Sequence, residues 1–113
     1  SDTNTKLFKA LSDPGRLRIL KMLQYRSLCV CEITSVLKLA PSTVSKHLQV
    51  LKEAGFIIEE KDGKWVNYKL NSSSTDPRVI SILTTLDFWI TDRINIEKDK
   101  ELVLKVDRVL LCK

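Results

Sequence analysis

Two short helical segments separated by only three residues are the feature that most constrains this fold. The first is expected over 30–37, and residues 38–40 follow it as a tight turn. Pro41 fits the first position of a second helix, because that position needs no amide hydrogen, and Gly55 is a typical residue to end that helix. Two helices joined this closely form a helix-turn-helix, which we expect over about residues 30–54.

A β-hairpin is predicted directly after the second helix. Phe56–Lys61 reads as one strand and Lys64–Leu70 as its return, with apolar and polar residues alternating in the second strand. Asp62-Gly63 between them is typical of a two-residue type I′ turn, since both residue types tolerate positive φ. Residues of about 56–70 are therefore expected to form the wing of a winged helix-turn-helix.

Further helices are expected on both sides of this unit. Residues 3–11 have helical apolar spacing, and Asp13 and Pro14 are suited to cap and open a second helix. From Pro77 to about Leu111 the chain has no glycine and no further proline, which favours one long helix, with a break in the charged stretch 97–101 as the alternative.

The predicted fold class is mainly α with a small β-hairpin. A chain of 113 residues is about one domain, so we expect a single winged helix-turn-helix domain over 1–113 with extra N- and C-terminal dimerisation helices. The two end helices carry more apolar surface than one small core can cover, and a two-fold dimer is the commonest solution. The alternative is that the terminal helix packs on its own domain. The expected interface residues are Leu7, Phe8, Leu11, Val79, Leu83, Leu86, Ile90 and Ile94.

The charge of the chain is distributed unevenly. The net charge is +5, and all of it lies in residues 1–71, which hold 12 Lys/Arg and 7 Asp/Glu, whereas residues 72–113 hold 7 of each. This asymmetry indicates a polyanion-binding module in the first two thirds. There is no apolar run long enough for a membrane span and no signal-peptide pattern, so the chain is expected to be cytoplasmic and not to bind a membrane.

The second helix of the helix-turn-helix has the pattern of a DNA recognition helix. Val44, Leu48 and Leu51 are expected to be buried, which turns a polar face outward. Such a face is often merely solvated, but here a tight turn and a hairpin flank it, and both are typical of double-stranded DNA binding. The residues expected to contact bases or phosphates are Ser42, Thr43, Ser45, Lys46, His47 and Gln49, with Lys61 and Lys64 in the wing. For His47, packing is the alternative to phosphate contact.

The three cysteines raise a separate question. Cys29 and Cys31 are two residues apart, a C-x-C spacing that fits neither a thioredoxin-like motif nor a zinc ribbon. Buried free cysteines are often simple core residues. Placed at the start of a helix, where thiolates are favoured, the pair could also be a metal-binding or reactive thiol pair. With one histidine, no phosphate-binding glycine loop and no C-x-x-C, the chain is not expected to be an enzyme or to need a catalytic cofactor.

Four motifs together resemble the ArsR/SmtB family of metal-responsive repressors, and most closely its arsenical-sensing members. They are DPGRLRIL at 13–20, SLCVCEI at 27–33, STVSKHLQVLKEAGFI at 42–57 and DGKWVNYKL at 62–70. The resemblance implies a homodimeric repressor that binds operator DNA and is released by a thiophilic ion. It implies As(III) or Sb(III) as the inducer, with Cys29 and Cys31 as ligands.

The sequence departs from the arsenical pattern at one position. Those sensors place a third cysteine three residues after the second, where this chain has Thr34, so Cys112 or an external thiol would supply the third ligand. A zinc site on the terminal helix is not expected, because no histidine follows His47. The alternatives are a redox or reactive-sulfur switch at the same thiols, a cadmium- or lead-type sensor, and a constitutive DNA-binding protein. The cadmium- or lead-type sensor is disfavoured because no cysteine precedes Cys29.

Overall fold

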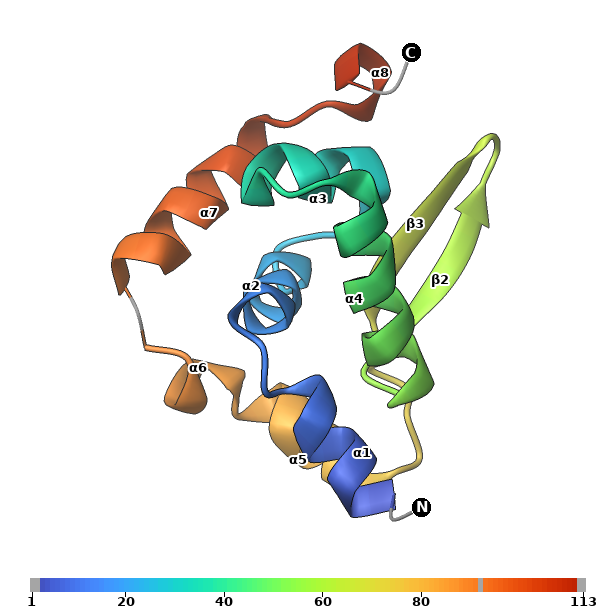
Figure 1. Ribbon diagram of the computed structural model, residues 1–113, viewed down its shortest axis with the longest axis vertical. Coiled ribbons are helices and arrows are strands. Elements are labelled where there is room, and N and C mark those ends of the chain that lie inside the picture. Colours follow the sequence, from blue (N-terminus) through green and yellow to red (C-terminus); the bar gives the residue numbers. More distant parts are fainter. Residues whose placement is uncertain (1–2, 92, 112–113) are drawn as a thin grey trace.

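The computed structural model describes residues 3–91 and 93–111, except for the side chains of Arg93 and Ile94. In chain order the elements are α1 (Thr3–Ala10), α2 (Pro14–Leu23), β1 (Leu28–Cys29), α3 (Val30–Leu37), α4 (Pro41–Glu53), β2 (Ile57–Asp62), β3 (Trp65–Leu70), α5 (Pro77–Thr84), α6 (Leu86–Trp89), α7 (Arg93–Lys105) and α8 (Arg108–Leu111). The hairpin of β2 and β3 projects beside α4, and α7 runs along the opposite side of the molecule (Figure 1). The predicted winged helix-turn-helix is confirmed.

The helix-turn-helix follows from local backbone signals. Lys38 ends α3 in the left-handed conformation, with φ 57° and its N–H on the Thr34 carbonyl at 2.8 Å. At the end of α4, Gly55 has φ +90°, and the N–H groups of Gly55 and Phe56 bond back to Lys52 and Leu51. This pair of bonds is a Schellman motif, in which glycine is favoured because it lacks a Cβ. The turn of 38–40 and the stop at Gly55 therefore lie where they were predicted.

The core lies where α2, α3, α4 and the base of the hairpin meet. Its largest fully buried side chains include Ile19, Leu20, Met22, Ile33, Leu48, Leu51, Phe56 and Ile57. Val44, Leu48 and Leu51 of α4 are buried, as their spacing predicted. The apolar stripe of α4 thus fixes which of its faces is turned to solvent.

The sheet differs from the prediction in two respects. A third strand, β1, pairs antiparallel with β3 and makes the order β1-β3-β2, although two residues gave too little pattern to predict a strand. Asp62 pairs with Trp65, so the turn residues are Gly63 and Lys64 rather than Asp62-Gly63. Gly63 has φ +61°, and Lys64 is not among the residues with positive φ. The predicted type I′ turn is therefore wrong, because that type requires positive φ at both central residues.

The single helix predicted over 77–111 is also wrong. Breaks occur around Thr85, at Ile90 and after Lys105, whereas the charged stretch 97–101 stays helical within α7. The hydroxyl groups of Thr84 and Thr85 donate to carbonyls of the preceding turn, which competes with helix continuation. One helix over 77–111 would be about 52 Å long, and the longest dimension of the molecule is 40 Å.

Two ion pairs, each with one buried member, hold the divided C-terminal region against α2. Arg18 binds both oxygens of Asp99 at 2.7 and 2.8 Å, and the Asp99 side chain is only 5% exposed. Lys21 is buried and bonds to the exposed Asp87 of α6. Val103 of α7 is fully buried in the same core. Helix α7 thus packs on its own domain, which was the alternative to dimerisation for the terminal helix. None of the described helices is long and apolar enough to cross a membrane.

The Arg18–Asp99 pair gives a direct test of this packing. Replacing Asp99 by Ala would leave the Arg18 guanidinium beside a buried gap, and we expect a loss of about 1–3 kcal/mol in the free energy of unfolding. The matched control is Glu101→Ala, an exposed acid on the same helix, which should change stability by less than about 0.5 kcal/mol. Urea unfolding measures both, and equal small losses would contradict the packing of α7 on α2.

Candidate DNA-binding face and thiol site

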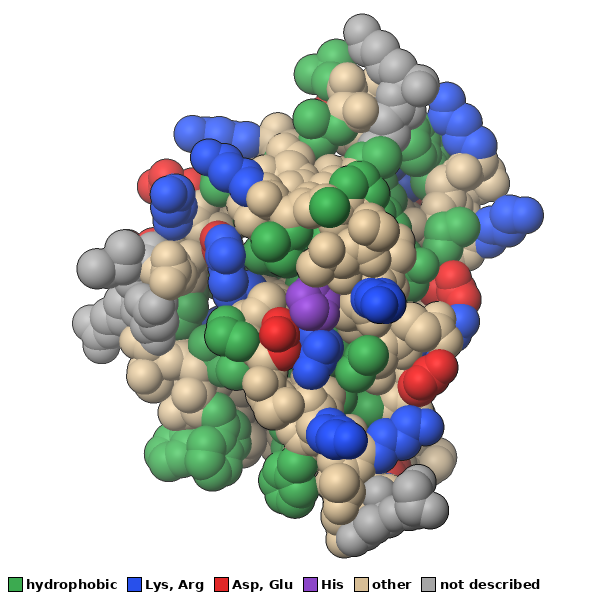
Figure 2. Space-filling model, in the orientation of Figure 1, with side chains coloured by type: hydrophobic (Ala, Val, Ile, Leu, Met, Phe, Trp, Pro, Cys, Tyr) green, Lys and Arg blue, Asp and Glu red, His purple; other side chains and the backbone are tan. Residues whose placement is uncertain are grey.

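Helix α4, the predicted recognition helix, presents the polar face that the sequence predicted. Its apolar stripe packs inward, and all but one of the predicted contact residues on α4 are exposed: Ser42, Thr43, Ser45, Lys46 and Gln49. These side chains can donate to and accept from base edges, and the Lys46 ammonium can reach a phosphate or a guanine. Figure 2 shows Lys and Arg side chains around this central part of the molecule.

His47 is the exception on this helix, because it is packed rather than exposed. It lies between α4 and the start of α2, with Nδ1 3.2 Å from an Arg16 nitrogen and Nε2 3.5 Å from Asp13. An arginine can only donate, so Nδ1 accepts and the ring proton is on Nε2, facing Asp13. Figure 2 shows this single histidine at the centre of the face with an acidic side chain beside it. The geometry matches the packing interpretation of His47.

Arg16 and Arg18 are both engaged inside the molecule. Arg16 donates to the carbonyls of Ala10 at 2.7 Å and Lys9 at 2.9 Å, so it caps the end of α1. Arg18 is bound to Asp99. These contacts orient α1, α2 and α7 around the helix-turn-helix.

The wing carries two exposed lysines near its tip. Lys61 and Lys64 are both solvent-exposed, and the Lys64 ammonium lies 4.9 Å from the centre of the Trp65 ring. The two wing glutamates each form an ion pair, Glu59 with Lys52 and Glu60 with Lys69 at 2.8 Å. The negative charge of the two glutamates is therefore partly neutralised.

Cys29 is the residue on which strand β1 ends and helix α3 begins. It pairs with Asn67 across the sheet, and it is the N-cap of α3 with extended backbone. Cys29 is not disulfide-bonded, and the residue is only 4% exposed. Burial raises the pKa of the Cys29 thiol, and the nearby Glu32 carboxylate raises it further. The thiolate predicted at this helix start is thus disfavoured, because desolvation outweighs the pull of the helix N-terminus.

Cys31 lies in the first turn of α3 and is half-buried. It is disulfide-bonded and Cys29 is not, so the two neighbouring cysteines are not bonded to each other. The predicted pair is therefore not present as two thiols in this structure. Cys112, the expected third ligand, lies outside the described residues. Within 3–91 and 93–111, no group of three His, Cys, Asp or Glu side chains is placed to hold a metal ion.

A hydrogen-bonded network next to Cys29, formed by Glu32 and Arg26, was not predicted from the sequence. One oxygen of the Glu32 carboxylate accepts the Cys29 N–H at 3.0 Å, and the other accepts from Arg26 at 3.1 Å. Arg26 also donates to the carbonyls of Val103 and Val106, both at 2.9 Å, at the end of α7. A glutamate three residues after an N-cap is the signal of a capping box, with cysteine here in the place of serine or threonine.

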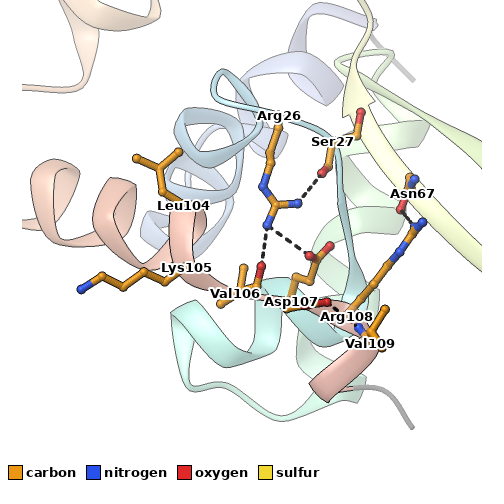
Figure 3. Close-up of a pocket in the computed structure, with 10 residues that line it drawn as sticks. Arg26, Ser27, Asn67, Leu104, Lys105, Val106, Asp107, Arg108 and Val109 are labelled. Carbon is orange, nitrogen blue, oxygen red and sulfur yellow. Dashed lines mark hydrogen bonds and ion pairs between the residues drawn. The ribbon is translucent and has the colours of Figure 1, made fainter.

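This network lines a polar hollow between the start of α3 and the C-terminal segment. Figure 3 shows Arg26 reaching toward Ser27 and Val106, while Arg108 on the other side points toward Asn67 of the wing. Lys105 extends away from both. The start of α3, the end of α7 and the wing therefore meet at one place in the fold.

The predicted dimer-interface residues are divided between the core and the surface. Leu7, Val79 and Leu86 are buried within the protomer, Leu11, Leu83 and Ile90 are half-buried, and Phe8 is 69% exposed. The side chain of Ile94, on α7, lies outside the described part of the structure. The exposed apolar surface instead includes two residues that were not predicted, Phe88 at 75% and Trp89 at 68%. With Phe8, Leu11, Leu17 and Ile90 they line an apolar hollow beside α6.

The chain is similar to several known regulators. Its residues 13–59 match the family described as bacterial regulatory proteins of the arsR family. An uncharacterised HTH-type transcriptional regulator of Methanocaldococcus jannaschii is 42% identical over 83 residues, which are 73% of this chain and 89% of that protein. The arsenical resistance operon repressor of Escherichia coli is 40% identical over 67 residues, or 58% of this chain and 57% of the repressor. The chain thus spans little more than half of that relative.

Among solved structures, the reduced form of HlyU from Vibrio cholerae superimposes with a TM-score of 0.64 at 30% sequence identity. The match covers 80% of this chain and 90% of HlyU. The match to the arsR family, at residues 13–59, runs from the cap of α2 through the helix-turn-helix and into strand β2. It therefore contains the thiol pair and the predicted recognition helix. The chain belongs to the ArsR family of winged helix-turn-helix, DNA-binding transcription regulators.

Proposed function

We propose that this chain is a homodimeric repressor that leaves its operator when As(III) or Sb(III) binds Cys29 and Cys31. The observation that carries the proposal is the position of the two cysteines. They begin α3, the helix that packs directly on the recognition helix α4. A change at the first turn of α3 is therefore passed on to the helix that would contact DNA.

The DNA contact is proposed for the exposed face of α4. Its N-terminal half would enter the major groove, where Ser42, Thr43 and Ser45 face base edges and Lys46 contacts a guanine or a phosphate. Lys61 and Lys64 of the wing would lie on the adjoining backbone or in the minor groove. The net charge of +5 supports this assignment, because phosphate neutralisation dominates DNA affinity.

The dimer is proposed to form through α1, α5 and α6. Phe8, Phe88 and Trp89 leave an apolar surface that is unusual for a monomer, and a second copy of this chain would cover it. A two-fold interface there would present two copies of α4 to two half-sites of a palindromic operator. The similarity to an arsenical resistance operon repressor supports the repressor role.

The thiol site is proposed to work by exchange of oxygen for sulfur around arsenic. Each thiol that binds arsenous acid gives its proton to a departing hydroxide, so two As–S bonds replace two As–O bonds and two water molecules leave. Cys112 or an external thiol is proposed as the third donor. Binding would draw the buried Cys29 sulfur toward Cys31, which breaks the hydrogen bond from the Cys29 N–H to Glu32 and unwinds the first turn of α3.

A second candidate function is a redox switch at the same helix. It is favoured by one observation, the disulfide-bonded state of Cys31. Formation of that disulfide from two thiols by hydrogen peroxide would remove two electrons and two protons and yield two water molecules. The two functions differ in what releases DNA: a metalloid acting on reduced protein, or an oxidant.

Lys46 tests the DNA-binding face. We expect Lys46→Ala to weaken operator binding and, if the lysine contacts a phosphate, to reduce the slope of log K against log salt concentration by about one. Fluorescence anisotropy across a salt series measures both. The control is Lys98→Ala, which removes an exposed lysine from α7 on the other side of the molecule. Unchanged affinity in Lys46→Ala would remove Lys46 from the interface.

Trp89 tests the dimer surface. Its side chain is 68% exposed, so Trp89→Glu should fold but place a charge in the proposed interface and shift the protein to monomers in sedimentation velocity. Leu104→Glu is the matched control, because Leu104 is 65% exposed on α7, outside the proposed interface. If both variants remain dimeric, the interface does not lie on α6.

The thiol proposal predicts that arsenite releases operator DNA from fully reduced protein. Cys29→Ser and Cys31→Ser should each abolish or strongly weaken the response, while the affinity of the metalloid-free protein is retained. Cys112→Ser assigns the third donor, because an unchanged response would mean that an external thiol supplies it. Release by peroxide but not by arsenite would replace the As(III) proposal with the redox switch.

A further inference from the structure

The C-terminal arm, defined here as α7 and α8 over 93–111, contacts both the thiol end of α3 and the wing. Both regions are distant from the arm in the sequence. Two arginines join them to it, one at the thiol end of α3 and one at the wing. Arg26 joins the arm to α3, and Arg108 joins it to the wing (Figure 3). The arm is thus the segment that touches both the proposed sensor and a proposed DNA contact.

At the wing, Arg108 makes three separate contacts. One guanidinium nitrogen donates to Asn67 at 2.9 Å, another donates to Asp62 at 2.6 Å, and the carbon centre lies 5.1 Å from the centre of the Trp65 ring. A planar guanidinium suits this combination of a carboxylate, an amide and an aromatic face. Arg108 therefore fixes α8 to both strands of the hairpin.

The contact with Asp62 also changes the charge of the wing tip. Asp62 lies between Lys61 and Lys64 and is more than half exposed, so its carboxylate would repel an approaching phosphate. The ion pair with Arg108 neutralises that carboxylate. With Asp62 neutralised by the arm, Lys61 and Lys64 supply the positive charge that the wing tip presents to DNA.

At the thiol end, the contact runs through Glu32. Its carboxylate holds the N–H of Cys29 with one oxygen and Arg26 with the other, and Arg26 caps the last carbonyls of α7. Displacement of Cys29 would remove one of the two contacts that orient Glu32. It would thereby loosen Arg26, which donates to the carbonyl of Val106, two residues before Arg108.

We propose that the C-terminal arm couples the thiol site to the wing, with Arg108 as the positioning residue that holds the wing in its DNA-binding orientation. This inference rests on the proposed function. A ligand at Cys29 and Cys31 would act on DNA binding by two routes, through α4 by direct packing and through the arm by release of Asp62 and Asn67.

The test is the ratio of operator dissociation constants with and without arsenite, measured by anisotropy on reduced full-length protein. We expect Arg108→Ala to weaken metalloid-free binding, because Asp62 is left uncompensated, and to lower the arsenite ratio by about 2- to 30-fold. Asp62→Asn removes the same ion pair at an exposed position that tolerates substitution. It should lower the ratio similarly while keeping or raising the metalloid-free affinity. The control Lys105→Ala removes a neighbouring exposed charge and should leave the ratio unchanged.

The outcomes distinguish a failure of the coupling through the arm from a failure of the As(III) response. A wild-type ratio above one that falls in both Arg108→Ala and Asp62→Asn supports coupling through the arm. A raised wild-type ratio that is unaltered in both variants overturns the inference and leaves the As(III) response standing. A wild-type ratio of one contradicts the As(III) response and the inference together. Altered affinity with an unaltered ratio would mean that Arg108 contributes charge alone.

Discussion

The buried carboxylate of Glu32 is the interaction on which the rest of this structure depends. It accepts from the N–H of Cys29, the N-cap of α3, and from the guanidinium of Arg26 at once, and Arg26 in turn donates to two carbonyls at the end of α7. A buried charge is tolerated only when it is fully paired. The strand, the helix that carries the thiols and the C-terminal arm are therefore held in one arrangement by a single side chain.

Local signals in the sequence were enough to predict the helix-turn-helix and the recognition face. Pro41 and Gly55 bound α4, and the spacing of Val44, Leu48 and Leu51 fixes its buried side, so the polar side follows. The candidate DNA-binding residues on α4 could be chosen from this pattern because exposure on a helix is a matter of periodicity. His47 lies at the border of the two faces, and its partner Asp13 comes from another helix.

Tertiary contacts explain what the sequence could not predict. The stripe from Val79 to Ile90 has the same period as one long helix, but Arg18 and Lys21 on α2 pair with Asp99 and Asp87, and the chain leaves the helical conformation at Ile90 between these two acids. The contact of Arg108 with Asp62 joins residues 46 apart and has no local pattern. At Cys29, a helix start alone favours a thiolate, whereas burial and the Glu32 carboxylate raise the pKa of the thiol.

The central claim is that Cys29, although buried, becomes a ligand when the first turn of α3 opens. Arsenic K-edge X-ray absorption on the reduced protein loaded with one equivalent of arsenite tests this claim directly, because it counts the sulfur atoms around arsenic. We predict sulfur coordination in the wild-type protein and one fewer sulfur in Cys29→Ser. An identical sulfur count in wild type and Cys29→Ser would contradict the account.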